Sequence, residues 1–251
     1  MWLLPSYRRP NLCHEAVLAH VRAGTSTDVV LFVDPPHDGY DFELPPNWRL
    51  YLSSTHVGMA EAMRWAFRTY PNEAYYGWLS DDLHPRTVGW DMKLIEAAGQ
   101  FFMVCCNDLQ LATEPSIRDG VLPGAMCWGG NLVRAVGWWA LPGVNQAGID
   151  DAWIHLAHRL FDVKRYVPDV IVEHMSYKND KRPKDATDDW VRDGDRYIER
   201  DFETFNAWKS SLEPHLASLR IKDAMRAAGI NVEGDVMEAL LGPGFRSQQS
   251  T

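Results

Sequence analysis

Short apolar runs alternate with segments of helical periodicity through the first half of the chain. Residues 29–33 are Val-Val-Leu-Phe-Val, with an apolar side chain at every position. A strand of this kind is buried on both faces, as in a parallel sheet covered by helices. Apolar residues then recur at the helical period at Met59, Ala62, Met63, Ala66 and Phe67. The alternation predicts an α/β fold with a mostly parallel, mixed sheet flanked by helices.

The other expected elements follow from the same patterns. Further strands are expected at 1–5, 48–52, 74–79, 101–106 and 167–172. Further helices are expected at 11–21, 90–97 and 150–160. Thr87 is expected to cap the helix at 90–97 and Gly99 to end it. Segment 121–149, which is rich in glycine and tryptophan, is typical of loops or of close backbone approaches.

The pattern changes after the expected strand at 167–172. Residues 178–195 are dense in charge around Pro183, whereas residues from 197 onward contain helix formers. We therefore expect a main α/β domain at 1–176, a charged loop or lid at 177–196, and a helical extension at 197–251 packed on the same domain.

Composition limits the possible partners and locations. The 34 acidic and 25 basic residues give a net charge of -9, which disfavours binding to nucleic acid by phosphate neutralisation alone. A local basic groove is still compatible with that charge. No apolar stretch approaches the roughly 18–20 residues of a membrane-spanning helix, and residues 1–5 turn polar too soon for a signal peptide. These features predict a cytoplasmic protein without a membrane partner.

An acidic pair follows directly on the apolar segment 74–79. Asp81 and Asp82 come after Ser80 at the expected carboxyl end of a buried strand, and ligands of open α/β sheets bind beyond such ends. Mg²⁺ and Mn²⁺ take oxygen ligands and often lie between carboxylates and substrate phosphates. The pair could therefore hold a metal-bound diphosphate. Alternatively, either aspartate only caps the turn ahead of Pro85.

The order of these motifs resembles the GT-A fold of nucleotide-sugar glycosyltransferases, of the family 2-like kind, over about residues 1–175. The segment from Leu3 to Pro10 resembles that family's first strand and nucleotide loop, and the segment from Val29 to Asp34 resembles its second strand. The helix that begins near Gly58 is similar to the one before the family's acidic DxD motif. That motif falls at Ser80-Asp81-Asp82, where serine replaces the first aspartate.

Three more segments match the family in order. Gly129-Gly130-Asn131 resembles the stretch that lines the sugar and acceptor pocket, Asp150-Asp151 resembles the acidic pair that supplies the general base, and His174 lies where many members have a further metal ligand. The resemblance thus implies metal ligation by Asp82 and His174 and a base at Asp151 or Asp150. The nucleotide sugar would be bound by Pro5, Ser6, Arg8, Asp34, Asp81, Gly129, Gly130 and Lys178.

Each of these residues also has a structural interpretation. Asp150 could be a helix N-cap, and His174 an ordinary polar residue at a strand end. Arg8 and Arg9 could be solvated, Asp34 could only end its strand, and Gly129-Gly130 could be a plain turn. The basic cluster of Lys178, Lys181, Arg182 and Lys184 could clamp a diphosphate or a polyanion, or be a solvated surface.

The expected activity is metal-assisted transfer of a sugar from a nucleoside-diphosphate donor to an acceptor hydroxyl. The family resemblance favours UDP as the nucleotide of the donor. The cofactor would be Mn²⁺ or Mg²⁺, and inversion or retention stays open. A hydroxymethylated DNA base, as modified by phage enzymes, is one candidate acceptor. Two alternatives are a non-catalytic nucleotide- or sugar-binding module, which the serine at position 80 favours, and a nucleotidyltransferase. The absence of a glycine-rich, lysine-bearing phosphate loop counts against the nucleotidyltransferase.

Overall fold

The computed structural model describes residues 1–110, 125–160, 163–193, 195–230 and 232. The start of the glycine-rich segment at 121–124 and the expected helical extension beyond 232 lie outside the described residues.

The described strands form one mixed sheet in the order β3-β2-β1-β4-β7-β6-β8-β5. β1 pairs in parallel with β2 and β4, β2 with β3, and β6 with β8. β7 runs antiparallel between β4 and β6, and β5 antiparallel to β8. The strands are β1 Trp2–Tyr7, β2 Val29–Asp34, β3 Trp48–Leu52, β4 Tyr75–Trp78, β5 Leu83–Pro85, β6 Met103–Asn107, β7 Met126–Gly129 and β8 Lys164–His174. The expected α/β fold with a mostly parallel sheet is confirmed.

Helices cover both faces of this sheet, because neighbouring strand residues point to opposite sides. In β1, Leu3 belongs to a core shared with α2, α5 and α6, whereas Trp2 and Leu4 belong to a core shared with α1 and α3. The helices on the sheet are α1 Pro10–Arg22, α2 Gly58–Thr69, α3 Trp90–Ala98, α5 Gly130–Val136 and α6 Ile149–Arg159. None of the helices in the described part of the chain has an apolar stretch that could span a bilayer.

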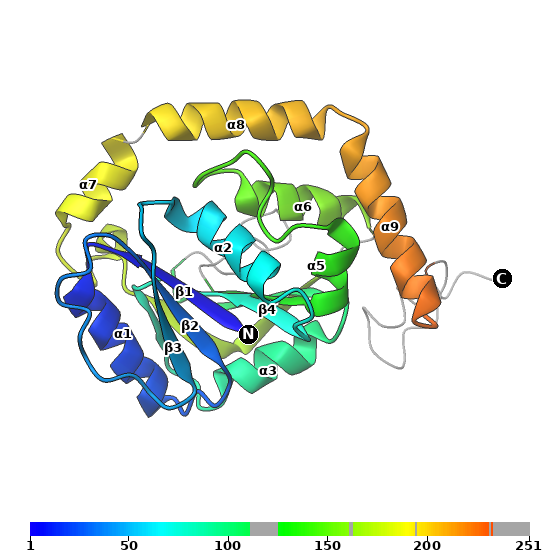
Figure 1. The fold of residues 1–251 in the computed structure, drawn as a ribbon. Coiled ribbons are helices and arrows are strands. Elements are labelled where there is room, and N and C mark those ends of the chain that lie inside the picture. The colour runs from blue at the N-terminus through cyan, green and yellow to red at the C-terminus, as the bar shows by residue number, and fades with distance from the viewer. Residues whose placement is uncertain (111–124, 161–162, 194, 231, 233–251) are drawn as a thin grey trace.

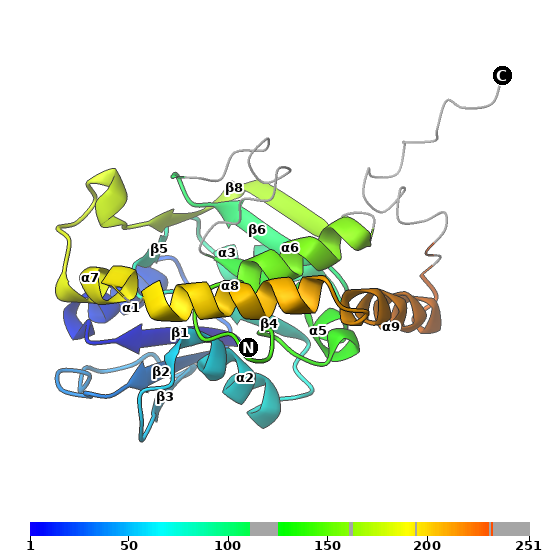
Figure 2. The ribbon, with the colours of Figure 1, turned by 90° about the horizontal axis from the view of Figure 1, so that it is seen from above.

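The C-terminal helices form an arm around one side of the molecule (Figures 1 and 2). The arm comprises α7 Ala186–Asp193, α8 Asp195–Lys209 and α9 Glu213–Ala227, preceded by the short 3₁₀ helix η1 Tyr177–Asn179. α9 contacts α5 and α6, and α8 contacts α6. Phe205, Ile221 and Met225 are buried in the same core as α2 and α6, so the arm is part of the packed structure.

Three local expectations differ from the structure. The glycine-rich segment contains β7 and α5 where loops are expected, although Gly129 and Gly130 do make close backbone approaches. The charged segment contains η1 and α7. Thr87 does not cap α3: Gly89 is the N-cap, and the Thr87 hydroxyl oxygen accepts a hydrogen bond from the Ile171 backbone N–H at 2.9 Å. Gly99 does end α3, with a φ of 48°. β7 has four residues and ends in glycine, too little for a strand pattern to stand out.

His20 lies fully buried on α1 between two tryptophan rings. The ring centroids of Trp48 and Trp90 are 5.4 and 5.3 Å away. The Thr25 hydroxyl accepts a hydrogen bond from Trp90 Nε1 at 2.8 Å and lies 3.2 Å from His20 Nδ1. Burial, with a smaller contribution from His84, lowers the pKa of His20 to about 3. The folded protein therefore holds this imidazole neutral.

His20 is expected to make the protein sensitive to acid. The unfolded chain binds a proton on this imidazole as the pH falls below about 6.5, whereas the folded protein does not until about pH 3. The contribution of neutral His20 to the free energy of unfolding is therefore fully present above pH 6.5 and is lost as the pH falls towards 3. At pH 5 the loss amounts to about 2 kcal/mol. Urea unfolding at pH 7.5 and 5.0 should show this loss in the parent but not in His20→Gln.

The matched control is the exposed histidine His215. His215→Gln should lose as much stability between the two pH values as the parent does. Equal losses in the parent and in His20→Gln would show that His20 does not cause the acid sensitivity.

Candidate functional site

The acidic pair lies where three parallel strands end. β4 is parallel to β1, and β1 to β2, so their carboxyl ends share one edge of the sheet. Ser80, Asp81 and Asp82 begin one residue after the end of β4, and the Asp82 carbonyl oxygen accepts a hydrogen bond from the Met175 N–H at 2.7 Å. The end of β8 is thereby held beside the acidic pair.

Asp82 and His174 are brought into contact although 92 positions separate them. His174 Nε2 lies 3.3 Å from Asp82 Oδ2, and the Ser80 hydroxyl donates to Asp82 Oδ1 at 2.5 Å. Burial opposes ionisation of Asp82, but the hydrogen bond from His174 leaves its pKa below the usual value. Burial likewise opposes protonation of His174, yet Asp82 raises the pKa of His174 above its usual value. Each of the two side chains thus favours the charged form of the other.

Asp81 is held differently from its neighbour. The Ser6 hydroxyl donates to Asp81 Oδ2 at 2.7 Å, and Arg9 Nη1 lies 3.5 Å from Asp81 Oδ1. The Ser6 oxygen is also 2.7 Å from the Tyr40 hydroxyl. A chain of polar contacts thus runs from Tyr40 through Ser6, on β1, to Asp81. Burial, and then the charge of Asp82, raises the pKa of Asp81 to about 7. Asp81 is therefore more easily protonated than its neighbour Asp82.

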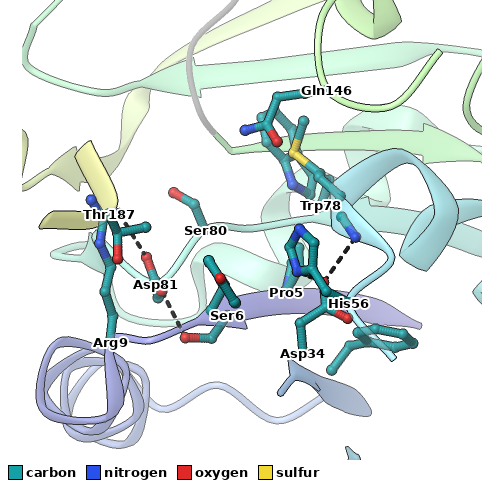
Figure 3. A pocket seen from close by; sticks show the side chains of 14 residues that line it. Pro5, Ser6, Arg9, Asp34, His56, Trp78, Ser80, Asp81, Gln146 and Thr187 are labelled. Atoms are coloured by element: carbon teal, nitrogen blue, oxygen red, sulfur yellow. Dashed lines mark hydrogen bonds and ion pairs between the residues drawn. The ribbon is translucent and has the colours of Figure 1, made fainter. Parts of the chain in front are cut away.

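A pocket of about 140 Å³ opens beside Asp81 (Figure 3). This is many times the space that one water molecule needs. Its lining includes four of the expected nucleotide-sugar residues, namely Pro5, Ser6, Asp34 and Asp81. Other side chains of the lining are Arg9, His56, Met59, Trp78, Ser80, Gln146 and Thr187. The structure thus brings four of the eight expected nucleotide-sugar residues together at one pocket.

Asp34 has a structural role as well as a place in the pocket. Its carboxylate accepts hydrogen bonds from the backbone N–H groups of Val57, at 3.2 Å, and Gly58, at 2.8 Å. His56 Nδ1 lies 3.0 Å from Asp34 Oδ2. The carboxylate therefore fixes the start of α2 on the end of β2, and His56 lies on the same side of the pocket (Figure 3).

Arg9 and Arg182 link the acidic pair to the charged segment. Arg9 donates to Asp185 through Nε and Nη2, each at 3.0 Å, and Arg182 donates to both oxygens of Asp188 at 2.6 and 2.8 Å. Arg182 Nη2 is also 3.6 Å from Asp82 Oδ2. Both guanidinium groups are largely buried. Two cations thus lie between two pairs of carboxylates.

The rest of the basic cluster is also partly paired. Lys181 Nζ lies 3.0 Å from Glu173 Oε1, and Lys184 pairs with Asp189. Lys178 is exposed on η1 and is not part of the pocket lining. The cluster is therefore a set of ion pairs more than an open basic surface.

Asp150 and Asp151 lie in the first turn of α6. The N-cap of α6 is Gly148, so Asp150 is not the cap. Asp150 is exposed and Asp151 half-buried, and burial, then the charge of Asp150, raises the pKa of Asp151. Neither aspartate lines the pocket, but Gln146, in the loop leading to α6, does.

Other expected site residues are not brought to the pocket. Gly129 pairs with Tyr75, at the amino end of β4, whereas Asp81 follows its carboxyl end. A Cβ atom on Gly130 would lie 2.0 Å from the Glu73 carbonyl oxygen, so these glycines permit close backbone packing. Arg8 is exposed over the Tyr7 ring.

The sequence analysis named Arg8 and not Arg9 as a donor-binding residue, and it missed Gln146. Pro10 occupies the first position of α1, where proline marks a helix start. Arg9 is therefore the residue at the turn between β1 and α1, and this signal could have separated it from Arg8. Gln146 lies between Gly143 and Gly148, both of positive φ, but glycines alone do not indicate which intervening side chain faces a ligand.

The donor set of Asp82 and His174 fits a divalent cation of the manganese type. Such ions accept carboxylate oxygen and imidazole nitrogen, and commonly take further ligands from phosphates and water. Within the described residues, no three His, Cys, Asp or Glu side chains converge on a metal position. A cation here would be held by two side chains and would take its other ligands from outside these residues.

Comparison with known proteins places the fold. No protein-family model and no curated protein sequence matches the chain. Among solved structures, a mycobacterial protein aligns with a TM-score of 0.52 over 74% of this chain and 68% of its own. GalNAc-T7, solved with UDP, GalNAc and Mn²⁺, aligns with a TM-score of 0.55 over 69% of this chain and 43% of its own.

Residues 1–349 of TarS from S. aureus align with a TM-score of 0.51 over 96% of this chain and 80% of that chain. Each of these three structures is 11% identical to this chain. This chain spans less than half of the GalNAc-T7 chain. At such identities the likeness establishes architecture, and function has to be argued from the site. The chain has a GT-A-like fold.

Proposed function

We propose that this protein transfers a sugar from a nucleoside-diphosphate sugar, UDP-linked, to an acceptor hydroxyl. The observation that carries the proposal is the contact of Asp82 with His174 at the edge of the sheet where Ser6, Asp34 and Asp81 line a pocket. The UDP and Mn²⁺ of GalNAc-T7, which shares the fold, support this choice of donor and metal.

The side chains of the site divide the work of binding the donor. Asp82 and His174 would hold the cation, which when bound offsets charge on a departing diphosphate. Arg9 and Arg182 are guanidinium groups suited to phosphate oxygens. Asp34 and His56 lie on the opposite side of the pocket (Figure 3), where they would contact the nucleoside. Asp151 would accept the proton of the attacking hydroxyl.

We propose residues 177–196 as a lid on the donor, between a catalytic domain at 1–176 and a helical extension at 197–251. Arg9 and Arg182 are now engaged by Asp185 and Asp188. A diphosphate offers the same arginines a similar arrangement of anionic oxygens, so donor binding would exchange the two carboxylates for phosphates. Lys178, on the same segment, would add a further cation to the lid.

Asp82→Asn is expected to remove the metal-dependent part of nucleotide binding. Thermal unfolding of the parent should shift upward with UDP, and further with UDP and Mn²⁺, because a ligand that binds only the folded state stabilises it. In Asp82→Asn the shift with UDP should remain and the increment due to Mn²⁺ should disappear, since the amide lacks the charge that holds the cation.

Asp28→Asn is the matched control. Asp28 is exposed and its carboxylate pairs with the exposed Arg49, so this variant should keep the full response to Mn²⁺. A parent that shows no shift with any nucleoside diphosphate, with or without Mn²⁺ or Mg²⁺, contradicts the proposed function. Nucleotide binding without turnover of any nucleotide sugar would assign the chain to the non-catalytic binding modules.

The acceptor is decided by a separate assay. The first acceptor to test is a hydroxymethylated DNA base. The net charge of -9 and the ion pairs of Lys181 and Lys184 within the protein reduce the expected attraction to DNA phosphates. Transfer of labelled sugar at low salt should be compared on modified DNA, unmodified DNA and saccharide acceptors. No transfer to modified DNA under conditions where another acceptor is used rules out the DNA version.

A further inference from the structure

A fully buried carboxylate on α8 holds the loop that leads to α6. Asp201 Oδ1 accepts hydrogen bonds from the Asn145 backbone N–H at 2.9 Å and from its side-chain amide at 3.1 Å. Asp201 Oδ2 accepts from the N–H groups of Gln146 at 2.7 Å and Ala147 at 2.9 Å. Three successive backbone donors thus converge on one carboxylate. A buried charge needs such partners, and they in turn fix the conformation of the loop.

The same loop is held from its other side by α2. The Asn145 carbonyl oxygen accepts a hydrogen bond from the Ala60 N–H at 3.1 Å. Arg64 Nη1 donates to the carbonyl oxygens of Leu141 and Val144 at 3.0 and 2.9 Å. A surface loop usually keeps considerable conformational freedom. These hydrogen bonds restrict that freedom in the loop before α6, which is far from the acidic pair in sequence.

Gln146 is the side chain that this fixed loop presents to the pocket. It lies beside Trp78, across the pocket from Arg9 and Thr187 (Figure 3). Its amide makes no hydrogen bond to another described residue, and the ring N–H of Trp78 is likewise buried without a hydrogen-bond partner among them. An amide offers both donors and an acceptor without charge, which suits hydroxyl groups better than phosphates.

We propose that Gln146 recognises the sugar of the nucleotide-sugar donor through hydrogen bonds to its hydroxyl groups, and that Asp201 is the positioning residue for Gln146. This inference rests on the proposed function. The arginine side of the pocket suits phosphate, and the side with Asp34 and His56 suits the nucleoside, so the part beside Trp78 and Gln146 remains for the sugar. An aromatic ring there gives the apolar face of a sugar a surface to pack on.

The order of residues along the chain supports this assignment. Asp150 and Asp151 follow Gln146 by four and five positions, and Gly148 turns the chain into α6 with a φ of 76°. A Cβ atom on Gly148 would lie 3.2 Å from Phe205 Cβ of α8. The helix that carries Asp201 therefore fixes the backbone between the sugar-binding amide and the proposed base.

The test compares the binding of UDP with that of UDP-sugars. Calorimetry with Mn²⁺ should give dissociation constants for UDP, UDP-glucose, UDP-galactose and their N-acetylated forms. For the sugar that the parent prefers, Gln146→Ala should bind the UDP-sugar about tenfold more weakly, as expected for two lost hydrogen bonds, and should bind UDP as the parent does. Gln100→Ala, at a glutamine whose amide pairs with Asn131, should change neither constant.

Asp201→Asn tests the positioning role. The new amide nitrogen would carry N–H donors that face the backbone N–H groups of the loop, so a hydrogen bond would be lost and the loop should become more mobile. The ratio of the affinity for UDP-sugar to the affinity for UDP should then fall towards the value in Gln146→Ala. Asp201→Glu keeps the carboxylate and should restore part of the ratio. A merely structural role would lower the melting temperature and leave the ratio unchanged.

The outcomes separate this inference from the proposed function. If the parent binds neither UDP nor a UDP-sugar, the proposed function fails and the inference with it. If the parent prefers a UDP-sugar to UDP and Gln146→Ala keeps that preference, only the inference is overturned. Should Asp201→Asn not fold, the comparison of Gln146→Ala with the parent still decides whether Gln146 contacts the sugar.

Discussion

Replacing Asp151 with asparagine is expected to lower the rate of sugar transfer by about 10²–10⁴-fold, which is the usual contribution of a general base. The asparagine side chain would keep the shape of the aspartate but could not accept a proton. Burial, with the charge of Asp150, raises the pKa of Asp151, and a carboxylate of raised pKa is a stronger base. Donor affinity should stay within about twofold of the parent, because donor binding is assigned to the other side chains of the site.

Single-turnover assays with saturating donor measure this effect, and two variants serve as controls. Asp150→Asn changes the exposed neighbour in the same turn of α6, and Asp223→Asn changes a carboxylate that is 74% exposed on α9. Both should transfer sugar at nearly the parental rate. If only Asp150→Asn lowers the transfer rate, Asp150 rather than Asp151 is the general base. Parental rates in both Asp150→Asn and Asp151→Asn would remove the general base from this helix turn.

The elements that were foreseen are those with strong local patterns. β2 is apolar from Val29 to Val33 and ends at Asp34 as expected, and α2 shows the helical period from Met59 to Phe67. β5 has three residues, one of them a proline, and β7 has four. Their pairing with β8, β4 and β6 is tertiary, and no short window of sequence contains it.

The site was foreseen to the extent that strand ends were. Asp81 and Asp82 follow a strand that could be recognised, and His174 follows another, so a common sheet edge could be expected for them. The link between Arg9 and Asp185 depends instead on where the C-terminal arm packs, which the local pattern does not encode. The same holds for Asp201, whose partners at 145–147 lie 54 to 56 positions away.

Thr87 shows how a residue with a correct local preference can serve another purpose. Threonine before a helix is a common N-cap, yet its oxygen accepts from the Ile171 N–H and its hydroxyl lies 3.3 Å from the Asp169 carbonyl oxygen. These bonds tie the start of α3 to β8. Tertiary hydrogen bonding has replaced the local cap, which leaves Gly89 at the N-cap position.

Gly130→Ala is expected to lower the free energy of unfolding by about 3 kcal/mol, the upper part of the range for overpacked sites. The added Cβ atom would lie 2.0 Å from the Glu73 carbonyl oxygen and 2.8 Å from that of Ala74. Both are backbone atoms, so no side-chain rotation relieves the clash. The Gly130 N–H also donates to Ala74 at 2.8 Å, and this bond would be strained as α5 moves away from β4.

Urea unfolding measures the loss, and UDP-sugar binding at a temperature where the variant is folded tests what the glycine does. Asn131→Ala, at the next position of α5, should change stability by no more than about 1 kcal/mol. Because Gly130 lies at the amino end of β4 and the pocket at its carboxyl end, folded Gly130→Ala should bind the donor like the parent. If Gly130→Ala instead has parental stability but no longer binds the donor, the sugar binds beside Gly130. The family resemblance implied that position, and the described pocket does not include it.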